Sequence, residues 1–214
     1  MGGQEPEPAV EAPDRLTPRR LEPFQFFCGV TLVRALAMAT AGAMAGALFL
    51  AATLMALLVL RRLEIPTGFE LSFAIGIVLQ GWGNALLLFE RIAWYDKAVH
   101  FLTPMLVVPP LYLLLARAGA VPSPWANGLR RGTLGVLVVT IALGIALAAV
   151  WEVIEGSADR WLGTSLAHGE TIDDLYSSLL GSVAAGAVLA WWVMSGGRDL
   201  AAERVAAEAL AERG

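Results

Sequence analysis

The sequence predicts an all-α integral membrane protein, a bundle of five transmembrane helices with six as the alternative. Hydrophobic residues make up 57% of the 214 residues and charged residues only 16%, whereas soluble domains average about 25% charged residues. The mean hydropathy is +0.65. The apolar residues gather in runs of about twenty, which is the length that an α-helix needs to cross a hydrocarbon core of ~30 Å.

Charge and cysteine content exclude several classes of protein. The net charge is −4 and no basic cluster with interleaved aromatic residues occurs, so we expect no nucleic-acid partner. The lipid bilayer is the expected environment. The chain has a single cysteine, Cys28, which rules out an intramolecular disulfide.

The composition divides the chain into three parts. Residues 1–20 are rich in Pro, Glu and Arg and predict a disordered N-terminal tail. Residues 21–195 form the transmembrane helical domain. Residues 196–214 are rich in Ala, Glu and Arg and predict an exposed C-terminal helical tail. The first apolar run is too long for a signal-peptide core and has no short basic segment directly before it, so no cleavable signal peptide is expected.

The first predicted span is Ala35–Leu60. Gly42 and Gly46 form a GxxxG pair within it, and such small residues allow a second helix to approach closely. No strong turn signal interrupts the tract 24–60, so a single span is favoured here. Dividing this tract in two gives the six-span alternative.

The second and third predicted spans carry polar or helix-breaking residues. Leu71–Phe89 contains Gln80 and Asn84, one turn apart, and amides in hydrocarbon need partners, so this face should look into the bundle. The third span is Val99–Ala116. Its prolines should kink it and leave backbone carbonyls for neighbouring groups to satisfy; they are Pro104, Pro109 and Pro110.

The fourth and fifth predicted spans are Gly132–Ile154 and Leu175–Met194. Trp191 and Trp192 end the last span where an aromatic belt would lie at the membrane surface. With five spans, the two sides carry seven and eight Lys and Arg residues, which does not decide the orientation. Without the N-terminal region, whose Arg residues are interspersed with acids, the count is three against eight. In the inner membrane, the side with fewer Lys and Arg residues is favoured as the extracytoplasmic side.

Polar residues gather at the ends of three spans on that side. Asp96, Lys97 and His100 begin the third span, and Asp96 and His100 share a helix face at i and i+4. The end of the fourth span carries Glu152, Glu155 and Asp159 on one stripe. The start of the fifth carries Thr171, Asp173 and Asp174. Charges in the membrane are costly, so such residues usually pair or function.

This set predicts several kinds of chemistry. A histidine with carboxylates is a suitable shell for Zn²⁺, Mn²⁺ or a similar divalent ion, with His100, Glu152 and Asp174 as the hypothetical ligands. The same groups could act as general acid and base. The hypothetical catalytic residues are Asp96, His100, Glu152 and Asp174, and the remaining polar cluster is Lys97, Glu155, Thr171 and Asp173. A serine hydrolase is poorly supported, because Ser177, Ser178 and Ser182 lack a GxSxG elbow.

Other interpretations of the same residues remain open. Asp96, Asp173 and Asp174 can complement a helix macrodipole or cap a helix, and helix ends can lie among hydrated headgroups. His100 or Lys97 could pair with Glu152 in a structural lock between three helices. A small transporter or proton path is a further alternative, with Gln80 and Asn84 extending a polar route.

Three short motifs resemble those of a known family. Tyr95-Asp96-Lys97 with His100-Phe101, Trp151-Glu152 with Glu155, and Thr171, Asp174 and Gly181 are similar to the motifs of YjdF-like inner-membrane proteins. More distantly they resemble VanZ-like proteins, which tend to have Asn at the position of Ser178. The resemblance covers residues 70–194 and implies a multi-pass inner-membrane protein without an established activity. The VanZ-like relatives, linked to glycopeptide resistance, suggest a lipid or envelope precursor as the ligand of a membrane-embedded enzyme.

Overall fold

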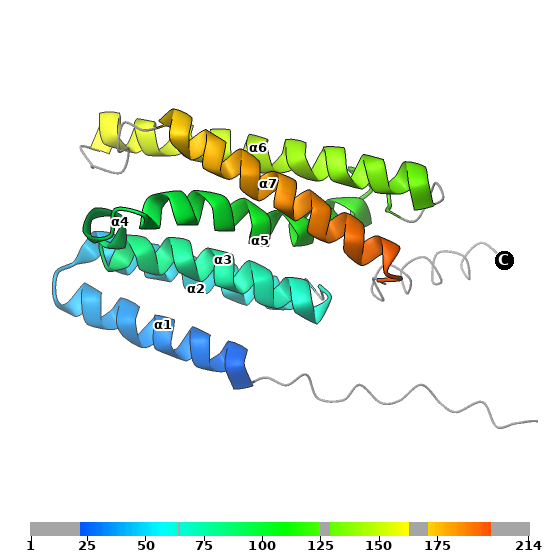
Figure 1. The fold of residues 1–214 in the computed structure, drawn as a ribbon. Helices are drawn as coiled ribbons and strands as arrows, with labels where there is room; N and C mark the ends of the chain where they lie inside the picture. The colour runs from blue at the N-terminus through cyan, green and yellow to red at the C-terminus, as the bar shows by residue number, and fades with distance from the viewer. Residues whose placement is uncertain (1–21, 64, 125–128, 163–170, 198–214) are drawn as a thin grey trace, which may run out of the picture.

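The computed structural model describes residues 22–63, 65–124, 129–162 and 171–197, and these residues form a helical bundle without strands (Figure 1). At residues 22–24, 45, 67, 129–131, 158, 159 and 162 only the backbone is described. The helices are α1 (Glu22–Thr40), α2 (Met44–Arg62), α3 (Thr67–Ala85), α4 (Leu88–Arg91), α5 (Tyr95–Arg117), α6 (Leu129–Leu162) and α7 (Thr171–Met194). The all-α fold class is therefore confirmed.

Three of the described helices are long and apolar enough to cross a membrane. They are Tyr95–Arg117, Gly132–Ser157 and Thr171–Met194, and Gln25–Thr40 is a shorter apolar helix. Many apolar side chains on the outside of the bundle are exposed, as are Leu134 and Val153 on α6, which suits a lipid environment. A helical membrane bundle fits these features, but the count of five spans is not confirmed.

The prediction of one span over Ala35–Leu60 is wrong, because α1 ends at Thr40 and α2 begins at Met44. Gly42 adopts a left-handed φ of +78°. The amide of Ala43 donates to the carbonyl of Met38 at 2.9 Å, and the amide of Gly42 donates to Ala39 at 3.2 Å. This pair of bonds is the Schellman motif that ends many helices at a glycine. Gly42 is therefore a turn residue and forms no GxxxG face with Gly46.

The six longer helices alternate in direction (Figure 1). One end of the bundle holds the α1–α2 turn, α4, the start of α5, the end of α6 and the start of α7. We call this the motif end, because the polar motifs of α5, α6 and α7 lie there. The start of α1 lies at the opposite end. This corrects the five-span topology, which placed the N-terminal region on the side of the motifs.

The second predicted span also ends earlier than expected. α3 stops at Ala85, and Leu87 has a left-handed φ of 56° before the short helix α4. The hydroxyl of Tyr95 donates to the carbonyl of Leu79 at 2.7 Å. This bond fixes the start of α5 against the last turns of α3.

The prolines of α5 are accommodated within one continuous helix, Tyr95–Arg117. Because Pro110 has no amide hydrogen, the carbonyl of Leu106 loses its partner within the helix. The hydroxyl of Ser72 on α3 lies 3.0 Å from this carbonyl and 2.9 Å from the carbonyl of Phe69, so it can donate its single hydrogen to either. The expected neighbouring donor is therefore present at this position.

Glycines bring α7 close to both α5 and α6. A Cβ at Gly181 would collide with the carbonyl oxygen of Phe101 on α5. A Cβ at Gly144 on α6 would collide with the side chain of Ser182 on α7. These contacts hold the three motif-bearing helices at short distances, which lets short side chains from each of them meet.

The apolar core lies toward the opposite end of the bundle. Leu57, Leu60, Tyr112 and Leu189 are among its fully buried residues. Trp192 packs edge-on against Phe69 at a centroid distance of 4.9 Å, whereas Trp191 is 64% exposed. Of these two tryptophans, Trp191 alone therefore has the exposure of an interfacial anchor. The predicted tails, residues 1–20 and the chain from 198 onward, lie outside the described residues.

Candidate functional site

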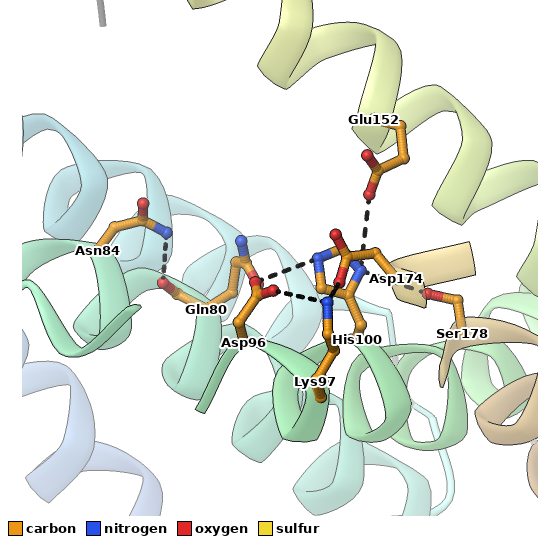
Figure 2. Close-up of polar contacts among 8 residues, drawn as sticks. All are labelled: Gln80, Asn84, Asp96, Lys97, His100, Glu152, Asp174 and Ser178. Carbon is orange, nitrogen blue, oxygen red and sulfur yellow. Dashed lines mark hydrogen bonds and ion pairs between the residues drawn. The ribbon is translucent and has the colours of Figure 1, made fainter. Parts of the chain in front are cut away.

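The polar residues of α5, α6 and α7 meet at the motif end of the bundle (Figure 2). α5 contributes the residues of its first two turns, α6 contributes residues near its C-terminus, and α7 contributes residues of its first two turns. We call the following residues the polar cluster: Asp96, Lys97, His100, Glu152, Glu155, Asp174 and Ser178.

Lys97 lies between two carboxylates. Its Nζ is 2.7 Å from Oδ1 of Asp174 and 3.6 Å from Oδ2 of Asp96. The side chain of Asp174 is only 7% exposed. Lys97 therefore ties the start of α5 to the start of α7, and Asp174 engages a neighbouring helix rather than only capping its own.

The imidazole of His100 has a different carboxylate at each nitrogen. Nε2 is 3.5 Å from Oδ1 of Asp96, one turn earlier on the same helix. Nδ1 is 3.8 Å from Oε1 of Glu152 on α6 and 3.4 Å from the hydroxyl oxygen of Ser178 on α7. The sequence predicted that His100 or Lys97 would pair with Glu152, and among the described ion pairs it is His100 that faces Glu152.

The carboxylate of Glu152 is largely enclosed and incompletely satisfied. Its side chain is 9% exposed, and its Oε1 has no hydrogen-bond partner. The distance of 3.8 Å to Nδ1 of His100 is too long for a hydrogen bond. A buried carboxylate oxygen in this state costs free energy unless a proton or a cation compensates it.

The remaining predicted residues lie in different surroundings. The side chains of Thr171 and Asp173 are exposed at the start of α7. Gln80 and Asn84 interact locally, because the amide of Asn84 donates to the backbone carbonyl of Gln80 at 2.9 Å. The side chain of Asp159 lies outside the part of the chain that the structure describes.

Ser178 is the member of the polar cluster that the sequence analysis did not select. It is buried, one turn after Asp174 on the same face of α7, and its backbone carbonyl accepts from the hydroxyl of Ser182 at 2.6 Å. The available signal was its i+4 spacing from Asp174. Ser178 has no serine-hydrolase motif around it, so no catalytic signature marks this position in the sequence.

A cavity of about 170 Å³ adjoins the polar cluster. His100 and Ser178 lie in its wall, so they belong to both features. Thr103, whose hydroxyl has no hydrogen-bond partner, also lines it. The other lining residues are mostly apolar and come from α3, α5 and α6; they are Ile77, Gln80, Val99, Pro104, Val107, Gly144, Leu147, Ala148 and Trp151.

A family model described as "Predicted membrane protein (DUF2238)" matches residues 24–195. The chain belongs to this family. The match includes α5, α6 and α7 and hence the whole polar cluster. No curated protein and no solved structure matches the chain.

Among the described residues of this DUF2238 protein, two groups of side chains could hold a metal ion, and His100 is in both. One consists of Asp96, His100 and Asp174, and the other of His100, Glu152 and Glu155. In each group one ligand atom per residue lies within 4.8 Å of the others. Glu152 and Asp174, which the sequence analysis placed in one ligand set, therefore fall in different groups.

Proposed function

We propose that this DUF2238 protein is a membrane-embedded enzyme that acts on a lipid or a lipid-linked envelope precursor. The observation that carries this proposal is the position of His100 and Ser178, which lie in the wall of a mostly apolar cavity and also in the polar cluster. An apolar chain would occupy the cavity, and the polar part of the same molecule would meet the cluster.

His100 is the group best placed for proton transfer. Its nitrogens face Asp96 on one side and Glu152 on the other, so a proton taken up at either nitrogen would be stabilised by a carboxylate. In this proposal His100 exchanges the proton, Asp96 and Glu152 orient the ring, and Asp174 positions α5 through Lys97. The ligand would bind beside Ser178 and Thr103.

The helix directions support an extracytoplasmic location of the polar cluster. Three basic residues of the described chain lie at the motif end, namely Arg91, Lys97 and Arg160, and Arg34 lies within α1 in the half nearer that end. Five lie near the opposite end: Arg61, Arg62, Arg117, Arg130 and Arg131. In the sequence, further Arg residues precede the start of α1 and follow the end of α7, and both of these helix ends lie at the opposite end. Positively charged segments stay in the cytoplasm, so we propose that the motif end faces outward from the inner membrane.

The motif resemblance supports the same proposal. The residues that resemble YjdF-like proteins and, distantly, VanZ-like proteins include Asp96, His100, Glu152 and Asp174. We propose that the chain is of this inner-membrane type and that its ligand comes from lipid or envelope metabolism.

The test uses a variant that fills the cavity and leaves the polar cluster intact. Ala148 lines the cavity and is buried, so Ala148→Phe should exclude an apolar chain. The purified protein is mixed with a polyprenyl phosphate or a phospholipid, and binding and turnover are followed by mass spectrometry. The wild type should bind and convert one of these probes, His100→Ala should bind without conversion, and Ala148→Phe should not bind. Equal binding by wild type and Ala148→Phe would contradict the proposal.

A second candidate function is a non-enzymatic lock between helices. The 2.7 Å contact between Lys97 and Asp174 favours it, because this pair joins α5 to α7. The two proposals differ in what His100→Ala should do. A lock predicts a protein with a lower melting temperature, whereas a catalytic role predicts an inactive protein whose melting temperature is nearly unchanged.

A further inference from the structure

We infer that Nδ1 of His100, with Glu152 and Glu155, binds a divalent cation such as Zn²⁺ or Mn²⁺, and that Asp96 positions the imidazole from Nε2. This inference assigns the metal to one of two candidate groups. It goes beyond the proposed function and replaces one of its parts, because an imidazole bound to an ion through Nδ1 acts as a ligand and no longer exchanges a proton. The cavity remains the proposed ligand site in either case.

The spacing of the donor atoms suits one shared ion. Two ligands of a tetrahedral zinc ion lie about 3.4 Å apart, since each is about 2.1 Å from the metal. Nδ1 of His100 and Oε1 of Glu152 are 3.8 Å apart, and the ligand atoms of the group with Glu155 lie within 4.8 Å of one another. Small side-chain rotations would bring all three to coordination distance.

The state of Glu152 points independently to a ligand. Its Oε1 is buried and has no hydrogen-bond partner, and only 9% of the side chain is exposed. A carboxylate oxygen in these surroundings requires a compensating positive charge or proton. A metal ion between it and Nδ1 of His100 would supply that charge and give the unsatisfied oxygen a partner.

The alternative group is a poorer cation site because Lys97 already occupies it. The ammonium of Lys97 lies 2.7 Å from Asp174 and 3.6 Å from Asp96. A second cation between these carboxylates would be repelled by the ammonium, at a separation where charges interact strongly. On the Nδ1 side, no described lysine or arginine forms a salt bridge with Glu152 or Glu155.

Asp96 then has the role that carboxylates often have behind a metal-bound histidine. Its Oδ1 faces Nε2 at 3.5 Å, on the far side of the ring from Glu152. An acceptor there keeps the proton on Nε2 and leaves the Nδ1 lone pair for the metal. Ser178 and the cavity lie beside Nδ1, so the remaining coordination position would be open to water or to a bound ligand.

The test is a titration of the full-length protein in detergent after treatment with a chelator. Zn²⁺ and Mn²⁺ are each added in equilibrium dialysis, and bound metal is measured by elemental analysis. Wild type should bind one ion per chain, and His100→Ala and Glu152→Gln should lose this binding. Asp96→Asn should weaken it by about 10- to 100-fold, the usual effect of removing such a partner. Asp174→Asn and the exposed control Asp173→Asn should retain it.

Two outcomes would overturn the inference. If Asp174→Asn lost the ion while Glu152→Gln kept it, the cation would lie on the Lys97 side of the ring. If wild type bound neither ion, there would be no site. Because a variant can fail to fold, Co²⁺ is also added to the wild type alone. A visible spectrum unlike that of hydrated Co²⁺ is expected, and an unchanged spectrum would contradict the inference. None of these measurements depends on catalytic activity.

Discussion

Lys97 on α5 and Asp174 on α7 form an ion pair at 2.7 Å although 77 positions separate them in the chain. The aspartate is almost fully buried, whereas about a third of the lysine side chain is exposed. The pair joins two helices directly beside His100, so it sets the position of the polar cluster as well as contributing to packing.

Removal of the lysine should destabilise the fold. Lys97→Met leaves Asp174 buried without its cation, and we expect a loss of about 2 kcal/mol, reduced from the value for a fully buried pair because Lys97 is partly exposed. Thermal unfolding in detergent measures it. The double variant Lys97→Met with Asp174→Asn should recover part of the loss. If the double variant were less stable than the single one, the buried charge would not be the cause.

Close packing of α7 on α5 depends on Gly181. In Gly181→Ala the new methyl group would collide with the backbone of Phe101, and neither backbone can move without separating the helices. We expect a cost of about 2 kcal/mol and altered ligand or metal binding at the polar cluster. Gly135→Ala on α6 is the matched control, since a Cβ there meets nothing within 4 Å. Equal melting temperatures for the two variants would contradict the close approach.

The α1–α2 turn depends on the conformation of Gly42. Its φ of +78° is unfavourable for residues with a Cβ, so Gly42→Ala should lower the stability by about 1 kcal/mol. Gly68→Ala introduces the same methyl group at a position with no neighbour within 4 Å and no positive φ. We expect a lower melting temperature only in the Gly42 variant. If α1 and α2 formed one continuous helix, the two variants would have equal melting temperatures.

The orientation can be tested by labelling cysteines in intact cells. In a Cys28→Ser background, Trp94→Cys places an exposed thiol at the motif end and Ala118→Cys places one at the opposite end. A membrane-impermeant maleimide should label the first directly and the second only after permeabilisation. The reverse pattern would place the polar cluster in the cytoplasm.

The α3–α5 hydrogen bond predicts a smaller effect. Ser72→Ala removes the hydroxyl that can donate to the Leu106 carbonyl, and an unsatisfied buried acceptor costs about 1–2 kcal/mol. Thermal unfolding should show this loss. The exposed Ser195→Ala is the control, because its hydroxyl bonds only within its own helix end. A loss no greater than that of Ser195→Ala would contradict this role of Ser72.

The sequence was sufficient for the helical class and for the three helices that carry the motifs. Long apolar runs predict α-helices in lipid, because a helix forms its backbone hydrogen bonds within the segment. The i, i+4 spacing of Asp96 and His100 predicted their shared face. Gly42 was misjudged because the same residue type serves both as a close-packing surface and as a helix C-terminus. The two roles are distinguished by the hydrogen bonds across the turn, which the sequence does not show.

The partners within the polar cluster were harder to predict. Composition placed acids and bases at one end of the bundle, but the choice of Asp174 rather than Glu152 for Lys97 depends on the rotation of each helix about its axis. That rotation is set by contacts such as Gly144 with Ser182, which connect positions far apart in the sequence. The roles of the residues as ligands or catalysts stay predictions.

The ring of His100 connects ligand binding at Nδ1 with the contact between Nε2 and Asp96. Any ligand that engages Nδ1 fixes the proton on Nε2 and so strengthens the contact with Asp96, which in turn shares Lys97 with Asp174. Coupling of this kind is reciprocal, so whatever strengthens the contact of Asp96 with Nε2 would also raise the affinity for a ligand at Nδ1. A molecule that binds Nδ1 from the cavity would thus change how tightly Asp96 is held on the opposite side of the imidazole.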